Sequence, residues 1–115
     1  MEQWKKIEGY ENYKVSNQGR IVNSKTRQLL YGHINASRGY HTIVLTRDKK
    51  TKSYSIHRLV AQAFIPNPEN KELVMHTDRD NENNNVSNLY WMSHPEFMVW
   101  SDLNQRKLSQ QKKLI

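Results

Sequence analysis

A stretch rich in asparagine and aspartate, set between two short apolar runs, is the feature that most restricts how this chain can fold. Leu73 to Met75 and residues 88–92 have the composition of short strands, and residues 78–85 between them are polar. Asparagine tolerates left-handed backbone geometry and bonds to its own backbone, which suits it to a turn. Ser93 is a good N-cap, and proline is favoured in a first helical turn. The stretch therefore predicts a hairpin followed by a helix from Pro95 to about Lys113.

The first half of the chain predicts short antiparallel strands joined by turns. Tyr13 and Val15 alternate with polar neighbours before a turn at residues 17–19, and residues 39–45 alternate before a charged turn at residues 47–50. Further strands are predicted at residues 20–23, 28–31 and 52–56, and the last of these should pair with residues 40–45. Together these elements predict a small N-terminal antiparallel sheet with basic turns.

One amphipathic segment lies between the predicted sheet and the hairpin. His57 opens a predicted helix that carries its apolar side chains on one face, and Pro66 with Pro68 ends it. The whole pattern predicts an α+β fold in which the sheet and the hairpin-helix unit pack as one body. The expected core residues are Trp4, Tyr10, Tyr13, Val15, Ile43, Leu45, Leu59, Val60, Phe64, Leu89 and Trp91.

Charge and cysteine content limit the classes of function. The 115 residues include 18 Lys and Arg against 11 Asp and Glu, a formal net charge of +7, which favours nucleic acid first and an acidic protein surface second as partners. The absence of cysteine excludes disulfides, thiolate zinc sites and cysteine nucleophiles. No apolar run approaches the ~20 residues of a membrane span, and the N-terminus has no signal-peptide core. We therefore expect no membrane partner and no secretion.

Two segments of the sequence resemble the phage HNH homing endonucleases. The N-terminal match is carried by Trp4, Ile7, residues 9–11, Tyr13, residues 15–17 and residues 19–20. The second match is carried by residues 56–61, residues 64–70, His76, Asp78, Asn83, Asn84, Asn88, Leu89 and Trp91. The resemblance implies a nuclease-associated β module at residues 1–55 and an HNH-like ββα core with its C-terminal helix at residues 56–115.

The resemblance also implies a ββα-metal site, in which one divalent cation, Mg²⁺ or Mn²⁺, works with a general-base histidine on a scissile phosphate. His76 would be that base, because a near-neutral imidazole can deprotonate water while the metal stabilises the developing charge. The implied partner is DNA, and the implied location is the cytoplasm of an infected bacterial host.

Two positions depart from the family pattern. Where the family commonly has Asp or Asn before the base, this chain has Met75, and where it has Asn or His six residues after Trp91, this chain has Phe97. A thioether is a poor ligand for hard cations, and a phenyl ring is no ligand. We therefore expect no bound cofactor and no metal-dependent cleavage.

Three other side chains are weak candidates for a rebuilt metal site. Asp78 lies close to His76 in sequence, although in this pattern it more often organises the turn. Glu96 neighbours Phe97, but one helical step turns a side chain by ~100°. His94, like His57, could bind a softer ion such as zinc, but no histidine pair has the i, i+4 spacing of a known site.

Basic residues interleaved with tyrosines predict a nucleic-acid face, with a solvated charged surface as the alternative. The predicted contacts are Lys14, Arg20, Arg27, Arg38, Arg47, Lys49, Lys50, Lys52 and Arg58. Homing nucleases of this type often continue into a helix-turn-helix reader, and since none follows residue 113 we expect little long-site specificity.

Three functions follow from these observations. The first is binding without cleavage, with DNA, structured RNA or a nucleic-acid-handling host protein as the target. The second is an active DNA nickase with His76 as base. The third is a protein-interaction module with Phe97, Met98 and Trp100 as apolar anchors if they are exposed.

Overall fold

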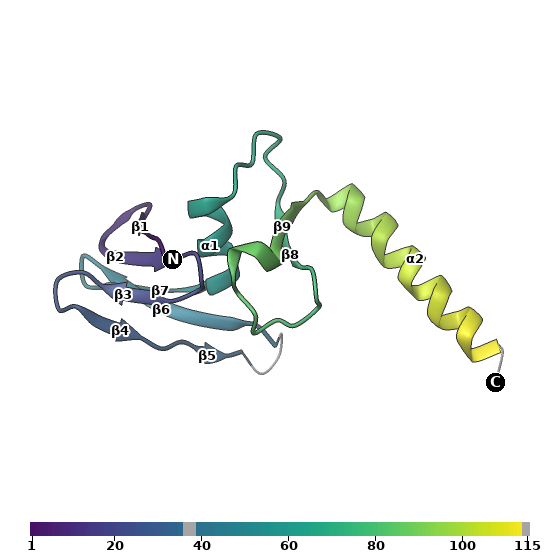
Figure 1. The fold of residues 1–115 in the computed structure, drawn as a ribbon, viewed down its shortest axis with the longest axis horizontal. Helices are drawn as coiled ribbons and strands as arrows, with labels where there is room; N and C mark the ends of the chain where they lie inside the picture. Colours follow the sequence, from purple (N-terminus) through teal and green to yellow (C-terminus); the bar gives the residue numbers. More distant parts are fainter. Residues whose placement is uncertain (36–38, 114–115) are drawn as a thin grey trace.

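The computed structural model describes residues 1–35 and 39–113, with the backbone alone described from residue 104 onward. Figure 1 shows an α+β arrangement, which confirms the predicted fold class, with small sheets around one short helix and a longer helix projecting from the body. In chain order the elements are β1 (Trp4–Ile7), β2 (Tyr10–Ser16), β3 (Ile21–Asn23), β4 (Gln28–Leu30), β5 (His33–Ile34), β6 (His41–Arg47), β7 (Lys50–Ser55), α1 (Ile56–Phe64), β8 (Leu73–His76), the 3-10 turn η1 (Val86–Asn88), β9 (Leu89–Met92) and α2 (His94–Lys113).

The N-terminal strands form two antiparallel sheets where one was expected. One sheet has the order β1-β2-β3-β4 and the other has the order β5-β6-β7. The chain leaves the first sheet at Gly32, where a Cβ atom would lie 2.2 Å from the carbonyl oxygen of Thr42. Because only glycine allows the backbone to pass this close to β6, the strand pairing is interrupted there. The predicted pairing of residues 40–45 with residues 52–56 is confirmed by the β6–β7 ladder.

Strand β1 is the element that the residue pattern did not separate from β2. Its sequence is Trp-Lys-Lys-Ile, and only Ile7 is buried, so apolar alternation is weak. It pairs with β2 through a turn at Gly9, whose φ of +83° lies in the left-handed region. The two lysines interrupt the apolar alternation, so the strand becomes apparent only from its pairing with β2.

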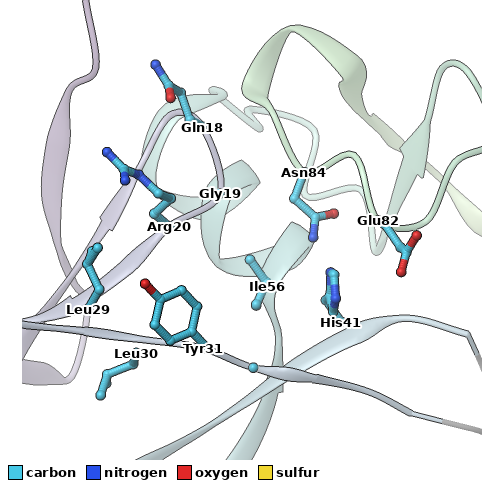
Figure 2. A pocket seen from close by; sticks show the side chains of 11 residues that line it. Gln18, Gly19, Arg20, Leu29, Leu30, Tyr31, His41, Ile56, Glu82 and Asn84 are labelled. Carbon is cyan, nitrogen blue, oxygen red and sulfur yellow. The ribbon is translucent and has the colours of Figure 1, made fainter.

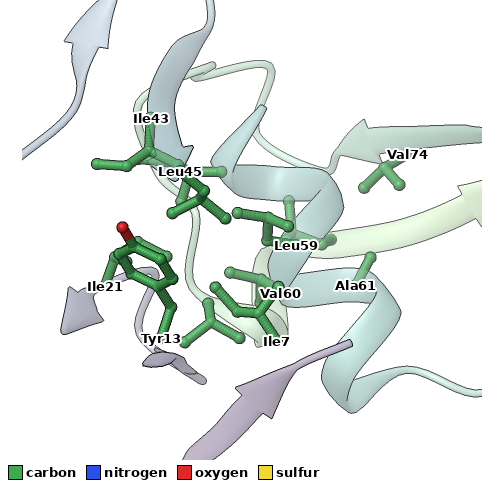
Figure 3. Close-up of a cluster of buried hydrophobic side chains, with 12 residues drawn as sticks. Ile7, Tyr13, Ile21, Ile43, Leu45, Leu59, Val60, Ala61 and Val74 are labelled. Atoms are coloured by element: carbon green, nitrogen blue, oxygen red, sulfur yellow. The ribbon is translucent and has the colours of Figure 1, made fainter. Parts of the chain in front are cut away.

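Helix α1 is the centre of the packing. It follows β7 directly, begins one residue before the predicted start, and buries Ile56, Leu59, Val60 and Ala61. It contacts strands of all three sheets, and Figure 3 shows its apolar face against residues of both N-terminal sheets and the hairpin. Helix packing of this kind accounts for most of the stability of so short a helix.

Most of the expected core residues are buried. Tyr13, Val15, Ile43, Leu45, Leu59, Val60 and Leu89 are buried as predicted, whereas Trp4, Tyr10, Phe64 and Trp91 are only partly buried. The four large side chains lie at the edge of the core, where their polar atoms or ring faces meet polar groups. For example, the Trp91 indole donates a hydrogen bond to the Ile65 carbonyl at 3.0 Å. Large amphipathic rings commonly take such positions.

The predicted hairpin and its following helix are both present. Strands β8 and β9 pair with His76 opposite Leu89, and α2 begins at His94. The Ser93 hydroxyl accepts from the Glu96 backbone N–H and the Glu96 carboxylate accepts from the Ser93 N–H, each at 3.2 Å, so the predicted N-cap is a complete capping box. Within the described residues, no helix combines the length and apolar character that crossing a membrane requires.

Candidate nuclease-type site

His76 lies at the end of β8 with its imidazole buried. Its Nε2 lies 2.8 Å from the amide oxygen of Asn84, which belongs to the polar loop of the hairpin. An amide oxygen can only accept a hydrogen bond, so Nε2 must carry the proton. The neutral ring then keeps its basic lone pair on Nδ1. This is the tautomer in which Nδ1 of His76 can take a proton from water.

A second histidine packs against the first. His57, in the first turn of α1, has its ring centroid 4.9 Å from that of His76 and 4.8 Å from that of Tyr40. Its Nδ1 atom is buried without a hydrogen-bond partner. Burial, followed by the nearby His76 and Arg58, lowers the pKa of His57 to about 4. His57 is therefore a neutral ring at physiological pH, and it packs inside the protein rather than facing solvent.

The loop between β8 and β9 is held by one carboxylate. The Asp78 side chain accepts hydrogen bonds from the Asn83 and Asn88 amides, both at 2.9 Å, and from the Asp80 backbone N–H at 2.8 Å. These bonds, Asn83 first, hold the pKa of Asp78 below its ordinary value. The loop geometry accounts for Asp78 without a metal ion, and it presents Asn84 to His76.

A cavity of about 280 Å³ lies beside His76. Met75 and Phe97, which come from β8 and from the first turn of α2, both line it. The remaining walls are Tyr40, Val74, Arg79, Asn81 and Trp100. The two residues that depart from the family pattern are therefore on the same cavity as the candidate base, as the predicted register requires.

The donors on this cavity do not fit a hard divalent cation. Among the described residues that line it there is no carboxylate, and the side-chain oxygens are the Asn81 amide and the Tyr40 hydroxyl. Hard cations bind through several oxygens, commonly with at least one carboxylate. The other lining groups are the His76 imidazole, the Arg79 guanidinium, a thioether, an isopropyl group and two aromatic rings, and none of these supplies an oxygen ligand.

The weak candidates for a rebuilt metal site lie elsewhere. The Glu96 carboxylate pairs with Lys71 Nζ at 2.9 Å and caps α2, and these contacts, Lys71 first, lower its pKa. His94 is exposed at the start of α2 and donates its backbone N–H to Glu72 at 3.0 Å. No group of three or more His, Asp or Glu suited to a metal occurs in the part of the chain that the structure describes.

A second cavity, of about 250 Å³, lies where the N-terminal module meets the hairpin loop (Figure 2). Gly19 and Asn84 form part of its wall, together with Arg20, Tyr31 and His41. A Cβ atom on Gly19 would lie 2.8 Å from the Asn84 Cβ, and the Val86 N–H donates to the Asn17 carbonyl at 2.8 Å. The N-terminal turn thus supports the loop that holds His76.

Several predicted nucleic-acid contacts have partners within the protein. Arg20 bonds bidentately to Glu2, whose pKa it lowers to about 2, and Arg58 donates to the Glu72 carbonyl and lies over the Trp91 ring. Arg47 donates to the Gly9 carbonyl at 2.8 Å. Lys6 and Lys14 lie directly opposite each other on the paired strands β1 and β2. Arg38 lies outside the described residues.

An exposed basic cluster lies at the tip of the β6–β7 hairpin. Arg47, Lys49, Lys50 and Lys52 gather there, and Arg27 is exposed on the turn before β4. The outer row of the β6–β7 ladder pairs Val44 with Ser53 and Thr46 with Thr51, so the sheet face is neutral and the cations lie at its end. The predicted basic sheet surface is therefore a basic hairpin tip.

Asn84 is the site residue that sequence reasoning assigned only to turn formation. It is eight residues from His76, and nothing in a run of three asparagines shows which amide turns inward. The contact between His57 and His76 also joins positions 19 residues apart in different elements. The His76–Asn84 bond depends on how the hairpin loop folds back, and the His57 contact depends on the hairpin docking against α1.

Comparisons with known proteins agree with the predicted family. Residues 2–46 match the NUMOD4 motif and residues 54–99 match an HNH endonuclease model. An uncharacterised HNH endonuclease of Acanthamoeba polyphaga mimivirus is 42% identical over 91 residues, covering 79% of this chain and 27% of the relative. The DNA endonuclease I-HmuI of Bacillus phage SP01 is 39% identical over 92 residues, covering 79% of this chain and 52% of the relative.

The fold also matches a solved structure. The structure of the HNH homing endonuclease I-HmuI, which describes DNA binding and cleavage, superposes with a TM-score of 0.80 and 34% identity over 97% of this chain and 65% of that chain. The chain thus spans about half, or less, of the length of the curated relatives it matches. With a NUMOD4 motif before an HNH module and the same fold throughout, the chain belongs to the HNH homing endonuclease family.

Proposed function

We propose that this protein binds nucleic acid, with DNA as the main target, and does not cleave it by metal-dependent hydrolysis. The observation that carries this proposal is the cavity beside His76, which Met75 and Phe97 line and which has no carboxylate among its described lining residues. By the family resemblance, these two positions are the ones where metal ligands are expected. A general base without a Lewis acid leaves the charge on the phosphate and the leaving oxygen without stabilisation. We therefore expect the protein to bind nucleic acid without hydrolysing it.

The binding half of the proposal rests on charge and on family. The chain carries a net charge of +7, and the exposed cations Arg27, Arg47, Lys49, Lys50 and Lys52 are suited to phosphate contacts. The relative I-HmuI is a DNA endonuclease. We assign residues 1–55 to a β module that contributes all five of these cations, and residues 56–115 to the HNH-like core, acting in the cytoplasm of an infected bacterium.

Two assays on the full chain test the proposal. Fluorescence anisotropy with a labelled DNA duplex should show binding whose affinity falls about 10-fold or more between 50 mM and 200 mM salt, since phosphate contacts release counterions. An RNA hairpin measured in parallel ranks the two nucleic acids. Plasmid incubated with the protein and Mg²⁺ or Mn²⁺ should stay supercoiled. Salt-independent binding, or nicking that disappears in His76→Ala, would sink the corresponding half of the proposal.

A second candidate, an active nickase, is favoured by one observation. The bond between His76 Nε2 and Asn84 leaves Nδ1 of His76 basic, as a working general base requires. In that case Asn81 would have to supply oxygen to the ion, because it is the amide on the cavity wall. Nicking that requires both His76 and Asn81 would favour this candidate.

A further inference from the structure

The cavity beside His76 has aromatic walls built from distant parts of the chain. Tyr40 precedes β6, whereas Phe97 and Trp100 lie on the first turns of α2 with ring centroids 5.8 Å apart and planes 26° from parallel. The Met75 thioether completes the apolar lining. Such walls suit a flat, polarisable group far better than a hydrated cation with a phosphate.

The polar groups of the cavity are few, and besides the Tyr40 hydroxyl and the His76 ring they are two side chains of the hairpin loop, Arg79 and Asn81. The Arg79 guanidinium is 5.4 Å from the centre of the Trp100 ring, which places a positive charge beside the aromatic wall. Asn81 adds an amide that can both donate and accept. A cavity with apolar walls and a few polar groups is the usual composition of a small-ligand site.

The size of the cavity limits the ligand further. About 280 Å³ lies near the lower end of the ~300–1,000 Å³ of small-ligand pockets. This volume suits a one-ring or two-ring heterocycle.

We propose that this cavity takes one unpaired nucleobase from a bound nucleic acid, an inference that rests on the proposed nucleic-acid binding. Every base offers a π-face for stacking on aromatic side chains, an edge for the Asn81 amide, and a neighbouring phosphate for Arg79. The side chains that replace the metal ligands, Met75 and Phe97, then serve as walls of the base site. A fully paired duplex keeps its bases stacked and cannot fill the cavity.

Anisotropy titrations of the full chain with three labelled duplexes of equal length test the inference. One duplex is fully paired, one carries a single bulged adenine, and one carries an abasic nucleotide at the same bulge. The adenine bulge should bind about tenfold more tightly than the abasic bulge, in line with the stacking of one base. The abasic duplex has the same number of nucleotides and phosphates, so the two bulged duplexes differ only in the base.

Variants on α2 locate the effect. Trp100→Ala should reduce the adenine preference to less than about twofold, whereas Trp100→Phe should keep most of it, because a ring remains. Val99→Ala is the matched control, since Val99 is the preceding residue on the helix, is 62% exposed and does not line the cavity. Thermal melts of all variants establish that each is folded.

The outcomes separate this inference from the proposed function. Equal affinity of the wild-type protein for the adenine and abasic bulges would overturn the base site while leaving nucleic-acid binding intact. A preference that survives in Trp100→Ala, or disappears in Val99→Ala, would also overturn it. Failure to bind any of the three duplexes would overturn the proposed function, and the base site with it.

Discussion

At the scale of single residues, the Asn84 amide decides how His76 is presented. Replacing it in Asn84→Ala leaves the buried Nε2–H of His76 without an acceptor, which should lower the free energy of unfolding by about 1–3 kcal/mol. Urea denaturation measures the change. Glu82→Ala, at an exposed position on the same loop, is the control and should cost less than about 0.5 kcal/mol. Equal costs would mean that the hydrogen bond contributes nothing specific.

His57 makes the stability of the fold depend on pH. Burial lowers its pKa from 6.5 to about 4, so the unfolded chain binds a proton at a higher pH than the folded chain does. The contribution of neutral His57 is complete above pH 6.5 and is lost as the pH falls towards 4, by at most about 3 kcal/mol. His57→Phe keeps a ring beside His76 and cannot titrate. Its melting temperature should fall less between pH 6.5 and 4 than that of the wild type, and identical slopes would contradict this account.

At the scale of elements, the turn after β2 links the N-terminal module to the site. Gly19 has φ +84°, and an added Cβ would meet the Asn84 Cβ at 2.8 Å and the Asn84 carbonyl oxygen at 3.0 Å. Gly19→Ala should therefore cost about 2–4 kcal/mol, the sum of left-handed strain and overpacking. Gly9→Ala shares the strain, at φ +83°, but meets only the flexible Arg47 side chain at 3.4 Å.

The comparison of these two glycines isolates the contact with the loop. Gly9→Ala should cost about 1–2 kcal/mol by urea denaturation, and Gly19→Ala should cost clearly more. Only Gly19→Ala should also shift the NMR signals of the His76 ring. Similar costs and an unchanged His76 ring would show that the N-terminal turn does not support the hairpin loop.

The start of α2 carries Phe97 into the cavity and depends on its cap. Ser93→Ala removes the hydroxyl that accepts from the Glu96 N–H, and should lower stability by about 0.5–2 kcal/mol with a loss of helical circular dichroism. Ser101→Ala makes the same change inside the helix, where alanine is the better helix former. It should be neutral or slightly stabilising, and an equal loss there would argue against the capping role.

Sequence patterns predicted the elements best where one segment determines its own structure. The hairpin, the helix after Ser93, and the β6–β7 pair each have turn or cap residues beside an apolar pattern, and each was confirmed. Strand β1 and the break at Gly32 were missed because they depend on pairing with β2 and on the close approach to Thr42. Such features arise only in the assembled molecule.

At the scale of the whole molecule, the site likewise has some features that the sequence predicts and others that only the folded chain creates. The family pattern predicted which residue is the candidate base and which two positions depart from the pattern, and the fold brings all three to one cavity. The contacts of His57 and Asn84 with His76 could not be predicted, because the first requires knowing how the hairpin docks on α1 and the second how the hairpin loop folds back. The sequence shows where the cations are but not which groups they bind, since their partners, such as Glu2 for Arg20, come from distant segments of the chain.

The central claim is that Met75 and Phe97 remove metal-dependent cleavage from an otherwise intact scaffold. The most direct test is a plasmid-nicking assay in Mn²⁺ that compares the wild type with Met75→Asp combined with Phe97→Asn. We expect no nicking by the wild type and measurable nicking by the double variant, abolished again when His76→Ala is added. Nicking by the wild type that is lost in His76→Ala would contradict the claim.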